Sequence, residues 1–188
     1  AIFAGENAAG LNDYTKECED LAEQMDGVYY SKEFISEHKL NQFLNASNIL
    51  VFPYSGNGVN STSGALMRTL SAGKPIIATD EGRLRDLIGG VHGWKCATDN
   101  VEALAMCIKE SIRVFSTQKA QYKRMSENVL RLASERDWTI IAGLHSNAYQ
   151  KICAAWGFHH HSCLSPNPNG NAPLLCKQEK PSSNDQEE

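Results

Sequence analysis

The stretch NILVFPYSGNGVNSTSGALMRTLSAGKPIIATD, residues 48–80, organises the chain. It begins with an apolar run at 49–52, continues through a loop of small and polar residues at 54–63, and then shows helical spacing up to Gly73. A second apolar run follows at 75–79. This succession predicts strand, loop, helix and strand, the unit from which parallel α/β sheets are built.

The loop before the predicted helix has the composition of an anion-binding site. Ser61, Thr62, Ser63 and Gly64 lie where the first unpaired amides of the helix are expected. Such amides and the positive end of the helix dipole attract phosphate, and glycine lets a ligand approach the backbone. The same residues are also an ordinary helix cap, and most caps bind nothing. Because the loop follows the carboxyl end of a predicted parallel strand, we expect it to hold the phosphates of a nucleotide-linked substrate.

Apolar spacing along the rest of the chain predicts an α/β fold, a Rossmann-like parallel sheet with helices on both faces, followed by helices at the carboxyl-terminal end. Strands are expected at residues 2–3, 28–30, 49–52, 75–79 and 91–96. Helices are expected at 14–25, 36–44, 64–73, 83–88, 101–115, 118–134 and 139–156. The first strand is expected to be buried. One apolar helix face is expected from Tyr14, Cys18, Leu21, Ala22 and Met25.

The composition changes at Gly157. From there to the last residue, Pro, Asn, Ser, Gln and Glu replace most apolar residues. Such a segment buries too little apolar surface to offset the entropy of folding. The sequence therefore predicts one domain with closing helices over residues 1–156 and a disordered tail over residues 157–188.

Composition and charge argue against nucleic-acid binding and against a membrane-spanning segment. The chain has 188 residues, of which 41% are hydrophobic, and a net charge of −4. Its isoelectric point is near 5.9. A chain with this charge has no general basic field, so no nucleic-acid partner is expected. No run of 18 apolar residues is present, so the sequence predicts no transmembrane segment.

The cysteines and the first residues predict a cytoplasmic protein. The six cysteines stand at positions 18, 96, 107, 153, 163 and 176, and they form no CxxC pair. No basic and apolar leader opens the chain, so we expect reduced thiols and a cytoplasmic location. The sequence starts at Ala1 without a methionine, and we expect it to be a fragment of a longer protein.

Neither a metal centre nor a nucleophilic triad is expected. Asp80, Glu81 and Asp86 follow a predicted strand, but turn and helix-cap roles explain them better than acid–base or metal chemistry. The histidine run at 159–161 lacks a fourth metal ligand. The other histidines have no evident serine or cysteine partner.

A series of short segments carries a family resemblance. The segments are SNILVFPYS at 47–55, SAGKPIIATD at 71–80, Gly82, RDLI at 85–88, VHGW at 91–94 and DW at 137–138. In this order and spacing they resemble the carboxyl-terminal half of the family-four glycosyltransferases, which have the two-domain GT-B fold. The resemblance covers residues 1–152, and the succession is more specific than any single segment.

The resemblance implies that residues 1–156 are a partial nucleotide-sugar-binding domain with the donor diphosphate on loop 61–64. It also implies sugar transfer with retention of configuration, without a metal or other cofactor. The acceptor would bind a separate amino-terminal domain, which this chain lacks. A segment with the arginine and lysine that neutralise the diphosphate is missing too, so the chain by itself is expected to be inactive.

Two positions depart from the family pattern. The family has two glutamates eight positions apart, one at the donor sugar and one at the ribose, and Asn60 and Arg68 stand there instead. Asn60 can hydrogen-bond sugar hydroxyls. Arg68 can pair with a phosphate, or it can be an ion-paired surface residue. The predicted nucleotide-sugar-binding residues are Asn60, Ser61, Thr62, Ser63, Gly64 and Arg68.

The loss of both glutamates leaves three hypotheses for the function. The first is the donor-binding domain of a glycosyltransferase, which transfers a sugar from a nucleotide sugar to an acceptor. The second is a non-catalytic nucleotide- or partner-binding domain derived from the same fold. The third is a Rossmann-like regulatory domain unrelated to sugars.

Overall fold

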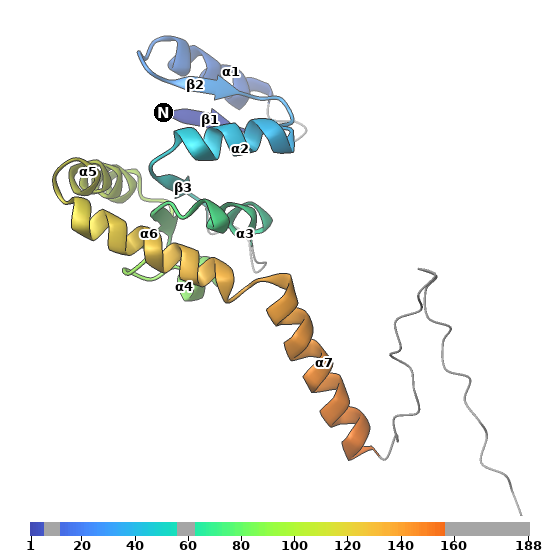
Figure 1. Ribbon diagram of the computed structural model, residues 1–188. Coiled ribbons are helices and arrows are strands. Elements are labelled where there is room, and N and C mark those ends of the chain that lie inside the picture. Colours follow the sequence, from blue (N-terminus) through green and yellow to red (C-terminus); the bar gives the residue numbers. More distant parts are fainter. Residues whose placement is uncertain (6–11, 56–62, 157–188) are drawn as a thin grey trace, which may run out of the picture. The chain divides into compact units, whose positions relative to one another are not determined.

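The computed structural model describes residues 1–5, 12–55 and 63–156 (Figure 1). The chain divides into two compact units, Ala1–Asp137 and a second that begins at Trp138. In the second unit the described part is helix α7 (Trp138–Ala155), which buries none of its residues. The predicted disordered tail, residues 157–188, lies outside the described residues. No helix in the described ranges combines the length and apolar character needed to cross a bilayer.

The first unit has the predicted α/β fold. Its elements in chain order are β1 (Ile2–Ala4), α1 (Asn12–Glu23), β2 (Tyr29–Ser31), α2 (Glu37–Ala46), β3 (Leu50–Phe52), α3 (Gly64–Thr69), the 3₁₀ turn η1 (Leu70–Ala72), β4 (Ile76–Thr79), α4 (Gly82–Leu87), β5 (Gly93–Cys96), α5 (Val101–Thr117) and α6 (Lys119–Ser134). The described strands pair in parallel as two sheets, β1 with β2, and β3 with β4 and β5.

Strand β4 is the centre of the three-stranded sheet. All four of its residues, Ile76–Thr79, are buried, and Ile76 pairs with Leu50 on one side and Gly93 on the other. A strand covered on both faces is apolar throughout, which is why this run is recognisable in the sequence. The core cluster on this sheet consists of Phe52, Leu66, Leu70, Ile76, Ala78, Leu84, Ile88, Val129 and Leu132.

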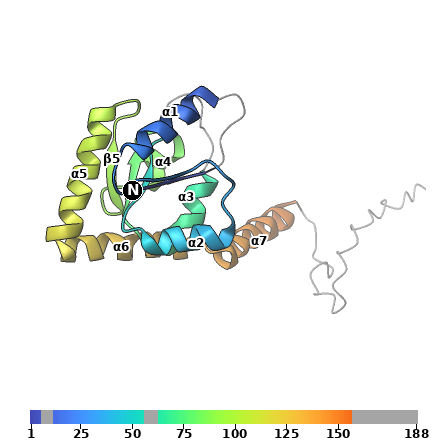
Figure 2. The same ribbon diagram turned by 90° about the horizontal axis from the view of Figure 1, so that it is seen from above.

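Helices α3, α4 and α6 contribute Leu66, Leu84, Val129 and Leu132 to that core, and α5 packs beside β5 (Figure 2). Helix α5 buries Ser111 and Val114, and α6 lies against both α5 and the turn η1. Of the closing helices predicted from helical spacing, α5 therefore lies along β5, and α6 packs on the core cluster and on α5.

Polar residues recognised in the sequence define several helix ends. Ser63 caps α3 by accepting a hydrogen bond from Leu66 N at 3.1 Å. Asn100 caps α5 by accepting one from Ala103 N at 2.7 Å. Gly73, predicted to end the helix before β4, follows η1 with a φ of 63°, a conformation that favours glycine.

The burial expected for the first strand is wrong. Ile2 is 41% exposed and Phe3 is 56% exposed. Of the predicted apolar helix face, Tyr14 and Leu21 are exposed and Cys18 and Ala22 are half-buried, while Met25 lies beyond the end of α1 and is exposed. Apolar spacing shows which face of an element can be buried, but it does not show whether another element covers that face.

Among the described glycines, Gly93 has the least room for a side chain. Its φ is 154°, and a β-carbon at this position would lie 1.8 Å from the Ile76 carbonyl oxygen and 2.6 Å from the Ile76 nitrogen. We expect Gly93→Ala to cost at least about 3 kcal/mol of unfolding free energy, because the backbone of β4 or β5 must move. Urea denaturation measures this loss. Gly90→Ala is the matched control, with open space around its β-carbon, and an equal loss in both variants would contradict the prediction.

His92 precedes β5, and its surroundings favour the neutral form of its imidazole. Its Nδ1 accepts a hydrogen bond from Gly89 N at 3.1 Å, which requires an unprotonated nitrogen. Burial, followed by the charges of Arg131 and Arg136, lowers the pKa of His92 below its ordinary value, and Glu135 opposes this effect. Protonation of His92 is therefore less favourable in the folded chain than in the unfolded chain.

The lowered pKa of His92 makes stability depend on pH. The unfolded chain binds a proton more readily, so the contribution of His92 is complete above the unfolded pKa of about 6.5 and is lost as the pH falls through the folded pKa. We expect His92→Asn, which keeps an acceptor but does not titrate, to lose less stability than the wild type between about pH 7.5 and about pH 5. Urea denaturation at several pH values measures both slopes. Carboxylates act equally in both proteins, so parallel curves would refute the role of His92.

Candidate functional site

The carboxyl ends of β3, β4 and β5 lie at one edge of the sheet, because the three strands run parallel. In open α/β sheets this is the edge at which ligands bind. Tyr54 and Ser63 follow β3, Asp80 and Glu81 follow β4, and Thr98 follows β5. These five residues after the strands carry hydroxyls and carboxylates.

Hydrogen bonds tie the three strand ends together. Thr79 Oγ1 donates to Phe52 O at 3.5 Å, which joins the end of β4 to that of β3. Asp80 N donates to Cys96 O at 2.8 Å, which joins the end of β4 to that of β5. These bonds hold the residues after each strand in a defined position relative to one another.

Tyr54 and Ser63 form a hydroxyl pair at the base of the predicted anion-binding loop. Tyr54 Oη and Ser63 Oγ are 2.6 Å apart, and Ser63 Oγ also accepts the cap bond from Leu66 N. Tyr54 is fixed by its ring, which packs edge-on against Phe52 with centroids 6.2 Å apart. The pair holds two hydroxyl hydrogens and uses one of them in its own bond, so the second can be donated elsewhere.

Asp80 is an ion-paired turn residue. Its Oδ1 lies 3.2 Å from Arg85 Nε and 3.5 Å from Lys95 Nζ. Arg85 Nη2 also donates to Asp80 O at 2.8 Å, and Lys95 Nζ donates to Arg85 O at 2.5 Å. Two cations thus surround this carboxylate, in keeping with the predicted turn role. The sequence analysis did not single out Lys95 as a partner of Asp80. The available signal was its position as a charged residue between Trp94 and Cys96 in a short strand.

Glu81 occupies the cap position of α4 but makes no side-chain cap bond. Its Oε2 instead accepts a hydrogen bond from Thr98 Oγ1 at 3.2 Å. The predicted cap role of Glu81 is therefore wrong for its side chain, because the threonine after β5 offers a donor that the sequence order does not reveal.

The structure describes three of the six predicted binding residues. Ser63 and Gly64 lie at the start of α3, and Arg68 lies in its last turn. The other three lie outside the described residues: Asn60, Ser61 and Thr62.

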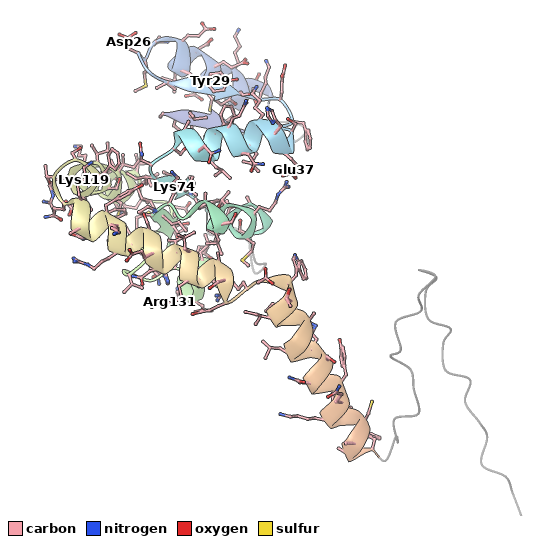
Figure 3. The ribbon with its side chains drawn as sticks, in the orientation of Figure 1. Asp26, Tyr29, Glu37, Lys74, Lys119 and Arg131 are labelled. Carbon is pink, nitrogen blue, oxygen red and sulfur yellow. The ribbon has the colours of Figure 1, made fainter. Side chains whose placement is uncertain are left out.

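Arg68 forms an ion pair with Glu37, which lies in the first turn of α2. Figure 3 labels Glu37. The two side chains are 55% and 73% exposed. Because both side chains are exposed to solvent, the ion pair contributes little to stability. Arg68 can therefore exchange Glu37 for another anionic partner at a small cost in free energy.

Solved glycosyltransferase structures have the same fold as this chain. Anabaena Alr3699/HepE in complex with UDP matches with a TM-score of 0.65 and 20% identity, over 80% of this chain and 40% of that one. Sucrose-phosphate synthase from Thermosynechococcus elongatus matches with a TM-score of 0.62 and 19% identity, over 82% of this chain and 38% of that one. The chain therefore spans about 40% of the length of these proteins.

A third structure is a single domain. The C-terminal domain of a glycosyl transferase group 1 family protein, LpcC from Francisella tularensis, matches with a TM-score of 0.57 and 18% identity, over 72% of this chain and 68% of that one. At these identities the likenesses show the fold alone. No curated protein matches the sequence.

The sequence itself carries the family assignment. The family described as "Glycosyl transferases group 1" matches residues 2–113, more than half of the 188-residue chain. The matched residues include every described strand and the helices α1 to α4. The chain therefore belongs to the group 1 glycosyl transferases.

Proposed function

We propose that this chain is the donor-binding domain of a glycosyltransferase that transfers a sugar from a nucleotide sugar to an acceptor with retention of configuration. The observation that carries the proposal is the family match over residues 2–113, which includes the whole β3–β4–β5 sheet and its carboxyl edge. Further support comes from HepE, whose solved structures include complexes with UDP and with UDP-glucose.

The proposed donor site is loop 60–64 together with Arg68. The support is the hydroxyl pair of Tyr54 and Ser63, which has one hydrogen to donate beyond its own 2.6 Å bond. A hydroxyl that donates to a charged phosphate oxygen makes a charge-assisted hydrogen bond of about 1.5–3 kcal/mol. Tyr54 was not among the residues predicted from the sequence, and its proposed role is to orient Ser63.

In the proposed mechanism, catalysis stabilises the departing diphosphate. Hydroxyl and amide donors that are fixed at the sheet edge stabilise the negative charge on the departing diphosphate without having to rearrange during the reaction. We propose that the acceptor comes from a separate amino-terminal domain and that the cations come from a preceding segment of the donor-binding domain, in agreement with the 40% of the HepE chain that this chain spans. Neither a metal nor another cofactor takes part in this proposal.

A second candidate function is binding without turnover. The observation that favours it is the presence of Asn60 and Arg68 where the resemblance leads us to expect two glutamates. In this alternative the fold keeps its nucleotide or protein partner but lacks the carboxylates that contact donor sugar and ribose. The two functions share the same binding site and differ in whether the sugar nucleotide is consumed.

Titration of the chain with UDP, GDP and ADP tests the donor site. We expect Ser63→Asp to weaken diphosphate binding at least about tenfold, because its carboxylate repels the phosphate. Aspartate is a good helix cap, so α3 is expected to keep its start. Tyr54→Phe keeps the ring and removes the hydroxyl, and we expect a smaller loss of affinity.

Ser71→Asp is the matched control for the added charge, because Ser71 is exposed in η1 at the other end of the same helical segment. Unchanged affinity in Ser63→Asp would reject the loop as the site. Affinity should also be unchanged by a chelator, since the proposal needs no metal. Release of the nucleoside diphosphate from sugar nucleotides by the longer protein distinguishes turnover from binding alone.

Arg68 can be tested separately through its ion pair. We expect Arg68→Ala to weaken diphosphate binding about tenfold and Glu37→Ala to leave it unchanged or slightly stronger, because removing Glu37 frees the guanidinium. Calorimetric titration of both variants measures these changes. Equal affinities in the wild type and both variants would show that Arg68 serves only the contact between α2 and α3.

A further inference from the structure

Two thiols meet where α5 packs beside β5. Cys96 is the last residue of β5 and is only 5% exposed, whereas Cys107 in α5 is partly exposed. Helix α5 packs along β5 and brings Cys107 beside the end of that strand. Cys96 Sγ donates to Ala78 O at 3.7 Å, and Cys107 Sγ donates to Lys95 O, the residue before Cys96, at 3.5 Å. Both sulfurs are therefore held in the same layer between strand and helix.

We propose that Cys96 and Cys107 are a dithiol that oxidises to an intramolecular disulfide, a modification site separate from the proposed donor site. A disulfide requires two sulfur atoms that can approach each other without movement of the backbone. The packing of Ser111 and Val114 keeps α5 in place, so the folded chain holds the two thiols together at high effective concentration.

The oxidant in this proposal is a small disulfide such as glutathione disulfide. The Cys107 thiolate, the more accessible of the two, attacks one sulfur of the oxidant, forms a mixed disulfide and releases one glutathione thiolate. The Cys96 thiolate then attacks Cys107 Sγ and releases the second glutathione thiolate. The protein loses two electrons and two protons, the oxidant gains the electrons, and the two thiolates take up the protons.

The environment of the pair sets the pH dependence of this reaction. Burial raises the pKa of both Cys96 and Cys107 above the ordinary thiol value. Only the thiolate attacks a disulfide, so the rate should increase about tenfold for each pH unit below these pKa values. The dithiol is therefore slow to oxidise at neutral pH and faster under mildly alkaline conditions.

The crosslink would act on the edge that carries the candidate site. Cys96 O accepts the hydrogen bond from Asp80 N at 2.8 Å, and Asp80 begins the turn after β4. A bond from Cys96 to Cys107 would fasten this strand end to α5.

A single tryptic peptide reports on the pair. Cleavage after Lys95 and Lys109 releases residues 96–109, which contain Cys96, Cys107 and no other cysteine. The full chain is incubated with a series of glutathione disulfide concentrations, blocked with iodoacetamide, digested and weighed by mass spectrometry. Oxidation of the pair makes this peptide lose two hydrogen atoms and escape alkylation. We expect this change in the folded chain at a glutathione disulfide concentration at least about tenfold lower than in the urea-unfolded chain.

Matched variants separate this pair from the other thiols. In Cys96→Ser, Cys107 should retain glutathione as a stable mixed disulfide, whereas Cys153→Ser should behave like the wild type. The proposal is overturned if wild-type Cys107 stops at the glutathione adduct while Cys96 is alkylated, or if folded and unfolded chains oxidise equally. The wild-type comparison decides the question even if Cys96→Ser fails to fold.

Discussion

The parallel pairing of β4 with β3 and β5 is the constraint on which the rest of the first unit depends. Every residue of β4 is buried, so its backbone polar groups must find partners on the two neighbouring strands. The close approach of Gly93 to Ile76 allows that pairing on one side. Because all three strands run in one direction, their carboxyl ends meet at one edge, and the polar residues that follow them become neighbours.

The polar groups at that edge are hydrogen-bond donors in fixed orientations and carboxylates that already have partners. Asp80 lies between Arg85 and Lys95, and Glu81 accepts from Thr98. These carboxylates are engaged in holding the turn after β4, which makes them poor candidates for acid–base catalysis. The hydroxyl pair that follows β3 has a hydrogen to spare. An edge of this kind suits the recognition of a phosphate group better than the activation of a nucleophile, in agreement with a proposed reaction in which the diphosphate departs.

Helix α5 connects this edge to the remainder of the unit. It packs beside β5 and brings Cys107 to Cys96, whose carbonyl oxygen is already hydrogen-bonded to Asp80. The same strand end therefore participates in the sheet, the candidate site and the proposed dithiol. Helix α7, in the second unit, buries none of its residues, although apolar residues recur along it. No other described element of that unit covers it.

The sequence by itself determined the fold class, the order of elements and several of their ends. The apolar run at 75–79 predicts a strand buried on both faces, and Ser63, Gly73 and Asn100 mark helix ends, because these signals depend on residues only a few positions apart. Only the tertiary structure decided which distant side chains meet. The pairing of Tyr54 with Ser63, of Lys95 with Asp80 and of Arg68 with Glu37 and the exposure of β1 follow from how the elements pack in three dimensions, and spacing along the chain carries no record of that packing.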